Sequence, residues 1–315
     1  MITVLAGGVG AARMLAGILQ VVAGSEVTAI VNVGDDLELH GLHVSPDLDT
    51  VTYTLAGAIN PVTGWGLVDE TWQAMATVSR YGGIDWFNLG DRDLGTHLFR
   101  TQRMSEGATL TEVTAEIALG WDLELRILPV TNDRLRTRVT VVDPGGSPDG
   151  HEVSFQEYFV KRHHDVPVVG VRFDGAVEAT PGPEVLRSIV DADLVVLAPS
   201  NPIVSIGPVL AVPGVRPAVE ARRDHVVAVS PIIAGAALKG PADRMLVELG
   251  HESSALGVAR LYAEVAGTLV IDEADAELAD AVEAEGLRCV VAPTIMAGPA
   301  ESAALARVVL GTGLG

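Results

Sequence analysis

Four aspartates fall within fifteen residues near the start of the chain, and their spacing suits phosphate chemistry. Asp35 and Asp36 end the segment NVGDD, and Asp47 and Asp49 belong to SPDLDT. Carboxylates packed this densely repel one another unless a positive charge lies between them. Mg²⁺ takes oxygen ligands and commonly bridges one or two carboxylates to substrate phosphates, which favours a metal or substrate site here. The alternative is a turn at residues 35–36, with the other two acids capping a helix that begins near residue 50.

A glycine-rich segment, GGVG at residues 7–10, could bind phosphate groups. Gly7, Gly8 and Gly10 follow an apolar run and precede a helical pattern, so phosphate oxygens could approach backbone N–H groups there. The run is neither a complete G-x-G-x-x-G fingerprint nor a Walker A loop. Arg13 could reach back to an anion or could be solvated. A tight turn from strand to helix, without a ligand, is the alternative.

A third polar segment, WFNLGDRDLGTH at residues 86–97, places Asn88, Asp91 and Asp93 in a loop bounded by glycines. The two acids flank Arg92, and the three residues have no obvious structural duty as a set. A substrate-binding loop and a capped helix beginning at Asp93 explain the pattern equally well.

Two further loops combine rigidity with hydrogen-bonding groups. LAPSNPIVSIGP, at residues 197–208, carries Ser200, Asn201 and Ser205 and follows an apolar run. VSPIIAGAALKG, at residues 229–240, carries Ser230, Gly235 and Lys239, one of only two lysines in the chain. Open α/β sheets bind ligands at the carboxyl ends of their strands, so both loops are candidates for nucleotide binding. For each, a loop without a function is the alternative.

The elements that position these segments alternate between strand and helix. Residues 2–6 and 27–33 are continuous apolar runs typical of parallel strands covered on both faces, and residues 11–22 have helical periodicity. Further core strands are expected at 194–198, 226–229, 268–271 and 289–292, with helices at 184–191, 209–210, 242–249, 255–263 and 274–285. The acids of 272–285 fit a solvated helix face. We therefore predict an α/β fold: a single Rossmann-like domain over residues 1–315 with a mostly parallel sheet.

The middle of the chain interrupts this alternation. Residues 50–121 hold all four tryptophans and helical patterns at 50–58, 70–81 and 110–119, which predicts a largely helical insertion. Residues 123–172 read as extra short strands at 124–128, 137–142, 152–159 and 168–172.

Composition excludes several classes of protein. With 41 acids against 21 bases and a formal charge of −20, the chain lacks the basic surface that coats nucleic acid. A single cysteine rules out a disulfide framework or a cysteine-rich metal site. The first residues do not form a signal peptide, and no apolar run approaches the length of about 20 residues that spans a bilayer. We expect a cytoplasmic protein without a membrane partner.

Taken together, the polar segments resemble the 2-phospho-L-lactate transferase family of deazaflavin coenzyme F-420 biosynthesis. The matching motifs are GGVGAARML, NVGDD, SPDLDT, WFNLGDRDLGTH, LAPSNPIVSIGP and VSPIIAGAALKG, in this order over residues 5–240. The resemblance implies a Mg²⁺-dependent transferase, commonly a homodimer, with a Rossmann-like core and a helical insertion. Such an enzyme moves a 2-phospho-L-lactyl or phosphoenolpyruvyl group from a guanosine diphosphate conjugate to the 5-deazaflavin Fo, releasing GMP and forming F-420-0 or its dehydro form. The preference for arginine over lysine is typical of a G+C-rich bacterium and favours the enolpyruvyl donor.

The resemblance also implies roles for individual residues. Asp36 and Asp49 are expected to hold Mg²⁺ and orient the attacking hydroxyl, with Asp35 and Asp47 as outer or alternative ligands, and one of these carboxylates accepts the hydroxyl proton. Fo is expected to contact Asp49, Asn88, Asp91 and Asp93, although Asn88 departs from the lysine that family members have there. The nucleotide is expected on Gly7, Gly8, Gly10, Ser200, Asn201, Ser205, Ser230, Gly235 and Lys239.

Two other classes of function remain. A dinucleotide-dependent oxidoreductase would use the glycine loop and an acid at the end of the second strand, but it has no use for Asp47 and Asp49. A non-catalytic, nucleotide-binding regulatory protein could share both features, and the WFNLGD and SNP segments argue for an enzyme with an acceptor substrate.

Overall fold

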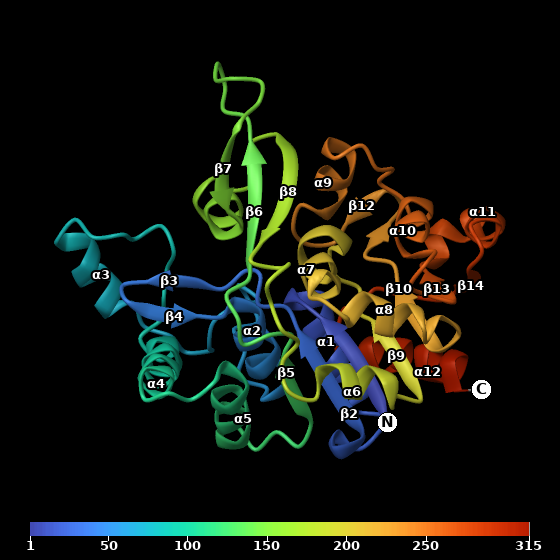
Figure 1. Cartoon of the computed structure of the whole chain (residues 1–315), viewed down its shortest axis with the longest axis horizontal. Helices are drawn as coiled ribbons and strands as arrows, with labels where there is room; N and C mark the ends of the chain where they lie inside the picture. Colours follow the sequence, from blue (N-terminus) through green and yellow to red (C-terminus); the bar gives the residue numbers. More distant parts are fainter. Residues whose placement is uncertain (315) are drawn as a thin grey trace.

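A seven-stranded parallel sheet forms the centre of the molecule in the computed structural model, which describes residues 1–314 (Figure 1). The strand order is β14-β13-β10-β9-β1-β2-β5, and every neighbouring pair is parallel. The strands are β1 (Ile2–Ala6), β2 (Val27–Val31), β5 (Arg126–Pro129), β9 (Leu194–Leu197), β10 (Val226–Val229), β13 (Thr268–Ile271) and β14 (Arg288–Val291). All five inner strands are buried along their whole length, as continuous apolar runs predict. The predicted α/β class is confirmed.

The order in which the chain adds strands to the sheet reverses beside β1. From β1 the chain adds β2 and β5 on one side, then returns to place β9, β10, β13 and β14 on the other. The loops that leave β1 and β9 therefore diverge to opposite faces, and a crevice opens between them at the carboxyl edge of the sheet. GGVG and the SNP segment follow these two strands.

Helices cover both faces of the sheet (Figure 1). α1 (Gly8–Ile18) packs between α2 (Pro46–Leu55) and the C-terminal α12 (Pro299–Leu314). The sequence pattern did not predict helix α12. The remaining helices are α3 (Gln73–Arg80), α4 (Asp93–Ser105), α5 (Leu110–Gly120), α6 (Val185–Val190), α7 (Gly207–Ala211), α8 (Val215–Glu220), α9 (Ala242–Glu248), α10 (Ala255–Tyr262) and α11 (Ala279–Ala284). Within the described chain, no helix is both long enough and apolar enough to span a membrane.

The interrupting region holds α2 to α5 together with a hairpin of β3 (Leu37–Leu39) and β4 (Leu42–Val44). The predicted helix at 50–58 begins earlier, at Pro46, because proline suits the first turn of a helix. α2 therefore carries Asp47 and Asp49 in its first turn, packed against α1 rather than in a preceding loop.

The short-strand region divides between two sheets. β5 joins the edge of the central sheet, whereas β6 (Arg136–Val141), β7 (His151–Ser154) and β8 (Val168–Asp174) form a separate antiparallel sheet that projects at the top of Figure 1. The strand predicted at 152–159 was wrong in its second half: Glu157–Lys161 is a short π-helix, which brings Phe155 and Phe159 into stacked contact with ring centroids 5.5 Å apart.

Acids 272–285 are not a uniformly solvated face. The predicted helix at 274–285 divides into a 3₁₀ segment, Glu273–Leu278, and α11. Asp272 is buried and accepts hydrogen bonds from the N–H groups of Ala274 and Thr294, at 3.0 and 2.8 Å. Asp275 is also buried and accepts the Ala234 N–H, fixing the loop after β10, which includes the small hairpin of β11 (Ile232–Ile233) and β12 (Ala236–Ala237).

Candidate active site

A cavity of about 730 Å³ opens at the carboxyl edge of the sheet, where the crevice is expected. Its walls come from the loops after β1, β9 and β10, from α2 and α4, and from an aromatic side that includes Trp86, Phe155 and Phe159. Of the residues predicted for the site, those that line it are Gly7, Gly8, Gly10, Asp35, Asp47, Asp49, Asn88, Asp93, Ser200, Asn201, Ser205, Ser230 and Lys239. Asp36, Asp91 and Gly235 lie outside the lining.

The glycine loop is locked to the loop after β9. The Ser200 hydroxyl donates a hydrogen bond to the Gly7 carbonyl at 2.7 Å, and a Cβ at position 10 would lie 2.1 Å from the Pro199 carbonyl oxygen. Position 10 therefore requires glycine because the two backbones approach each other closely. Asn201 caps the segment that follows it, accepting the N–H groups of Ile203 and Val204. The resulting floor of the cavity is rigid and rich in backbone groups.

Asp35, Asp36 and Asp47 form a group that we call the carboxylate triad. All three are buried, and burial together with repulsion from Asp47 and Asp36 raises the pKa of Asp35 well above its ordinary value. Burial likewise raises the pKa of Asp47 to about 7, although Asn32 donates a hydrogen bond to this carboxylate at 2.9 Å. Within residues 1–314, Asp35 Oδ1 and Asp36 Oδ1 are buried without a hydrogen-bond partner. The triad therefore crowds three carboxyl groups together, which favours the protonated forms of Asp35 and Asp47.

Asp36 faces the β3–β4 hairpin. Its Oδ2 accepts the Ser45 hydroxyl at 2.9 Å and lies 2.9 Å from His43 Nε2. Asp36 thus braces the turn between β2 and α2 and reaches the cavity only through its neighbours.

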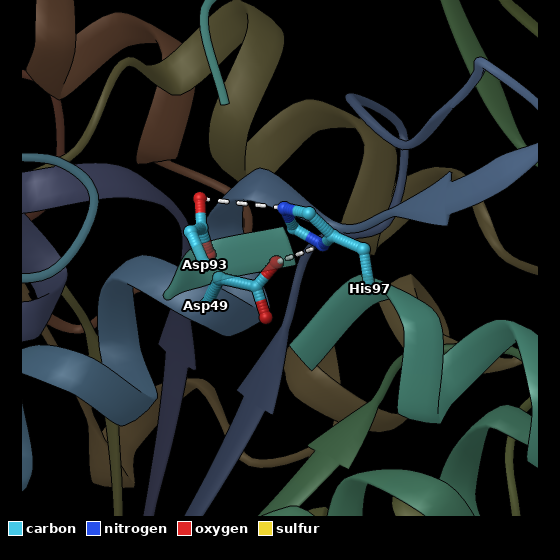
Figure 2. Close-up of side chains that lie close together, drawn as sticks. All are labelled: Asp49, Asp93 and His97. Atoms are coloured by element: carbon cyan, nitrogen blue, oxygen red, sulfur yellow. Dashed lines mark ion pairs between the residues drawn. The ribbon is translucent and has the colours of Figure 1, made fainter. Parts of the chain in front are cut away.

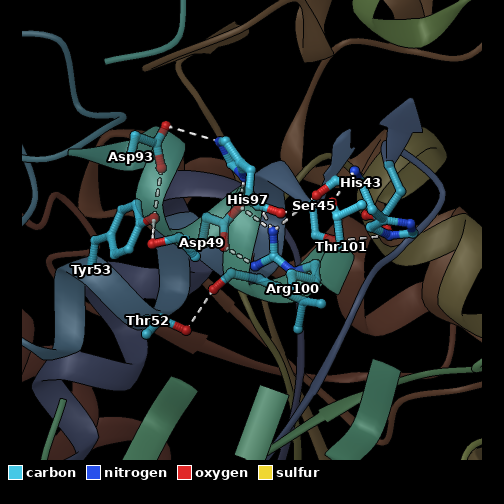
Figure 3. A network of polar contacts seen from close by, with 12 residues as sticks. His43, Ser45, Asp49, Thr52, Tyr53, Asp93, His97, Arg100 and Thr101 are labelled. Atoms are coloured by element: carbon cyan, nitrogen blue, oxygen red, sulfur yellow. Dashed lines mark hydrogen bonds and ion pairs between the residues drawn. The ribbon is translucent and has the colours of Figure 1, made fainter. Parts of the chain in front are cut away.

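Asp49 belongs to a different arrangement, the Arg100 network, which consists of Asp49, Asp93, His97 and Arg100 (Figure 3). Arg100 is 2% exposed, and its guanidinium donates to both carboxylate oxygens of Asp49. Burial raises the pKa of Asp49, and the charges of Arg100 and His97 partly offset that rise. The pKa of Arg100 is raised, because the attraction of Asp49 outweighs the effect of burial.

His97 links the two acids of this network. Arg100 Nη1 lies 3.3 Å from His97 Nδ1, which is also 3.7 Å from Asp49 Oδ2. Nε2 lies 3.3 Å from Asp93 Oδ2, and the Tyr53 hydroxyl donates to Asp93 Oδ1 at 2.6 Å. These contacts outweigh burial and lower the pKa of Asp93.

Sequence reasoning missed Arg100 and Tyr53. Asp93, His97 and Arg100 follow one another at helical spacing on α4, and Tyr53 lies one turn after Asp49 on α2. Polar residues repeated every three or four positions, on a face that must be buried, are the signal that would have found them.

Asp91 has a structural duty instead of a place in the cavity. It accepts the N–H groups of Gln73 and Ala74 at 3.0 Å, and also the Thr71 hydroxyl, so that it caps the start of α3 from a distance. The same contacts lower its pKa. Glu70 does the equivalent for α4, accepting the N–H groups of Arg92 and Asp93 at 2.8 Å.

Two places in the site can be compared as holders of a divalent cation. Asp49, Asp93 and His97 each offer one atom, and these atoms lie within 4.8 Å of one another (Figure 2). Arg100 already engages both oxygens of Asp49, however, and lies 3.3 Å from His97 Nδ1, so a guanidinium already occupies part of this place. Asp35 and Asp47 line the cavity and have raised pKa values, as crowded carboxylates show without a positive partner, which makes this pair a second candidate for a hard cation.

Comparison with known proteins agrees with the motifs. Residues 2–295 match the model of the family described as 2-phospho-L-lactate transferase CofD. The chain belongs to this family. Among its curated relatives, proteins named phosphoenolpyruvate transferase from Kitasatospora aureofaciens and from Mycobacterium avium are 45% and 44% identical to it, over 98% and 96% of this chain and 96% and 95% of theirs.

A solved structure shares the fold of this CofD-family chain. The structure of a UPF0052-family protein from Bacillus halodurans is 15% identical, covers 98% of each chain and superposes with a TM-score of 0.66. At this identity the likeness concerns the architecture alone.

Proposed function

We propose that this CofD-family protein transfers a phosphoenolpyruvyl group from a guanosine diphosphate conjugate to the deazaflavin Fo, releasing GMP and forming the dehydro form of F-420-0 in coenzyme F-420 biosynthesis. The observation that carries the proposal is that one cavity brings together the glycine loop and the buried carboxylates. Family membership and the names of the relatives support a transferase, and those names favour the enolpyruvyl over the 2-phospho-L-lactyl donor. The homodimer that the family resemblance implies and the cytoplasmic location expected from the sequence are part of the proposal.

The reaction exchanges a phosphoanhydride bond of the donor for a phosphate ester bond to Fo. A hydroxyl oxygen of Fo attacks the phosphorus that carries the enolpyruvyl group, and a new P–O bond forms. The bond from that phosphorus to the bridging oxygen breaks, and the bridging oxygen leaves with the electron pair as part of GMP. The hydroxyl proton passes to a carboxylate in the cavity. Positioning and charge neutralisation provide most of the rate enhancement in such transfers.

The residues divide this work by location. Asp35 and Asp47 of the triad face the cavity and would hold Mg²⁺ more readily than the pair Asp36 and Asp49 expected from the sequence, because Arg100 already engages Asp49. Bound there, Mg²⁺ would neutralise charge on the diphosphate. One of the carboxylates that line the cavity then accepts the hydroxyl proton, and Asn88 and Asp93 line the cavity together with Trp86, where Fo is expected. Ser200, Asn201, Ser205 and Ser230 form the side expected to hold the nucleotide.

A direct assay tests the proposal. The purified protein is incubated with Mg²⁺, Fo and either the enolpyruvyl or the lactyl guanosine diphosphate donor, and products are followed by mass spectrometry. We expect dehydro-F-420-0 and GMP in equal amounts, faster with the enolpyruvyl donor, and loss of product with a chelator or with Asp47→Asn. Because Asn88 lines the cavity and Asp91 does not, Asn88→Ala should raise the KM for Fo more than Asp91→Ala. Absence of transfer with both donors would overturn the proposal in favour of a nucleotide-binding protein. Light scattering of the purified protein tests the homodimer, for which a mass of twice that of one chain is expected.

A further inference from the structure

The charged groups that line the cavity are unevenly distributed. Asp35, Asp47, Asp49 and Asp93 supply negative charge, whereas Arg13 and Lys239 are the lining residues with a permanent positive charge. Neither cation lies within ion-pair distance of a carboxylate anywhere in residues 1–314, in contrast to Arg100, which is clamped to Asp49. The sequence left two roles open for Arg13, and the structure distinguishes between them.

Arg13 is held at the wall of the cavity. It follows the glycine loop on α1, and its Nη1 donates a hydrogen bond to the Met296 carbonyl at 3.1 Å. Met296 and Thr294, in the segment after β14, line the same wall. A guanidinium has five N–H donors in a planar fork, and across the described residues only this one bond uses them. The fork is therefore fixed at one corner, with most of its donors available to a ligand.

The glycine loop and the start of α1 lead from the neighbourhood of Asp47 and Ser205 to the segment after β14. A Cβ at Gly7 would lie 3.0 Å from Asp47 Oδ2, whereas Gly10 touches Pro199 after β9 and Arg13 touches Met296 after β14. Arg13 thus lies beyond the glycine loop as seen from the carboxylates. A diphosphate on this loop would have its reacting phosphate near the acids and its other phosphate toward Arg13.

We infer that Arg13 binds the phosphate group next to the nucleoside of the donor, the phosphate that leaves as part of GMP. This inference rests on the proposed function and adds a residue to it. As the bridging oxygen departs with its electron pair, negative charge grows on that phosphate. A planar guanidinium can pair with two phosphate oxygens at once, so Arg13 binds the donor and stabilises the leaving group.

Calorimetric titration with GDP, GMP and guanosine tests the inference without any turnover. Arg13→Ala is expected to weaken GDP and GMP binding by about tenfold or more, since hydrogen bonds to charged groups are among the stronger ones. Guanosine, which has no phosphate, is expected to bind both proteins equally. Arg13→Lys keeps the positive charge but lacks the planar guanidinium, so its affinities for GDP and GMP are expected to lie between those of the wild type and of Arg13→Ala. In the assay, Arg13→Ala is expected to lower kcat while leaving the KM for Fo unchanged.

A matched control is available on the neighbouring helix. Arg307 on α12 is exposed, as Arg13 is, and does not line the cavity, so Arg307→Ala is expected to bind all three ligands as the wild type does. Equal GDP binding by the wild type and Arg13→Ala would overturn the inference, as would an equal loss for GMP and guanosine, which would indicate a contact with the base or ribose. If the wild-type protein binds no GDP at all, the proposed function fails as well, which is a different result.

Discussion

Asp47 and Asp49 stand two residues apart on α2 but belong to opposite electrostatic situations. About 200° of helical rotation separates them, so they face different neighbours. Asp47 joins the carboxylate triad, where negative charges accumulate, whereas Asp49 joins the Arg100 network, where a buried guanidinium meets both of its oxygens. The charged form of Asp47 is therefore disfavoured by its surroundings, whereas the charged form of Asp49 has an ion-pair partner.

The difference indicates which group serves structure and which serves ligands. A buried charge without a partner weakens the folded state, and a protein can retain it when a ligand provides the missing charge. The triad has this character and faces the cavity through Asp35 and Asp47. The Arg100 network is already neutralised internally, and it holds α2 against α4.

The largest effect is expected from removing Arg100. Arg100→Met leaves Asp49 buried and unpaired, and breaking a buried ion pair from one side typically lowers the free energy of unfolding by about 3–5 kcal/mol. Urea unfolding at pH 7 measures the loss. The double variant Arg100→Met/Asp49→Leu removes both charges and should recover most of it. If Arg100→Met alone unfolds at the wild-type midpoint, Asp49 is not compensated by Arg100 and the contrast with the triad disappears.

The pH dependence of stability should identify the triad. Burial raises the pKa of Asp47 to about 7, above its ordinary value near 4, so the folded state binds a proton that the unfolded state has lost. Its favourable contribution is complete below about pH 4 and is lost as pH rises to about 7, a change on the order of a few kcal/mol. Metal-free protein should therefore become less stable from pH 5 to pH 7 in urea titrations.

Two controls sharpen this profile. Asp47→Asn has no carboxyl group to titrate and should flatten the dependence of the free energy of unfolding on pH. Millimolar Mg²⁺ should flatten the same dependence in the wild type, because a bound cation replaces the proton. Asp93 cannot produce the same slope: its lowered pKa makes its contribution fall as pH decreases, which is the opposite direction. A wild-type profile that rises from pH 5 to pH 7 would contradict the uncompensated triad.

A smaller effect concerns metal affinity. Asp35→Asn removes one charged oxygen ligand from the triad, and we expect Mn²⁺, used as a paramagnetic probe for Mg²⁺, to bind at least about tenfold more weakly. Asp93→Asn in the Arg100 network is the matched variant and should leave the affinity nearly unchanged. The reverse order would place the cation at Asp49, Asp93 and His97 instead.

The sequence predicted the sheet-edge part of the site well, for a local reason. Buried strands appear as apolar runs, and parallel strands end at one edge, so GGVG, NVGDD and the loops of Ser200 and Ser230 could be placed together without knowing any contact. Arg100 could not be found in this way, because its partner Asp49 is 51 positions away and the pairing depends on how α4 packs on α2. Asp275 was misjudged for a similar reason: its partner is the Ala234 N–H, in a residue with φ of +50° that nothing local in an acidic segment reveals.

The smallest effect tests how far the Arg100 network extends. Tyr53→Phe removes the hydroxyl that donates to Asp93 at 2.6 Å and contacts Thr96 Oγ1 at 2.7 Å, and the loss of such a bond typically costs about 1 kcal/mol, more when a charged acceptor is left in the interior. Burial and the nearby charges of Asp49 and Asp93 raise the pKa of Tyr53, so the hydroxyl is protonated and donating at neutral pH. The free energy of unfolding should fall by that amount while Mn²⁺ affinity and the pH slope stay as in the wild type. A change in either of those two quantities would mean that the network and the triad are coupled through α2 and respond to a ligand as one group.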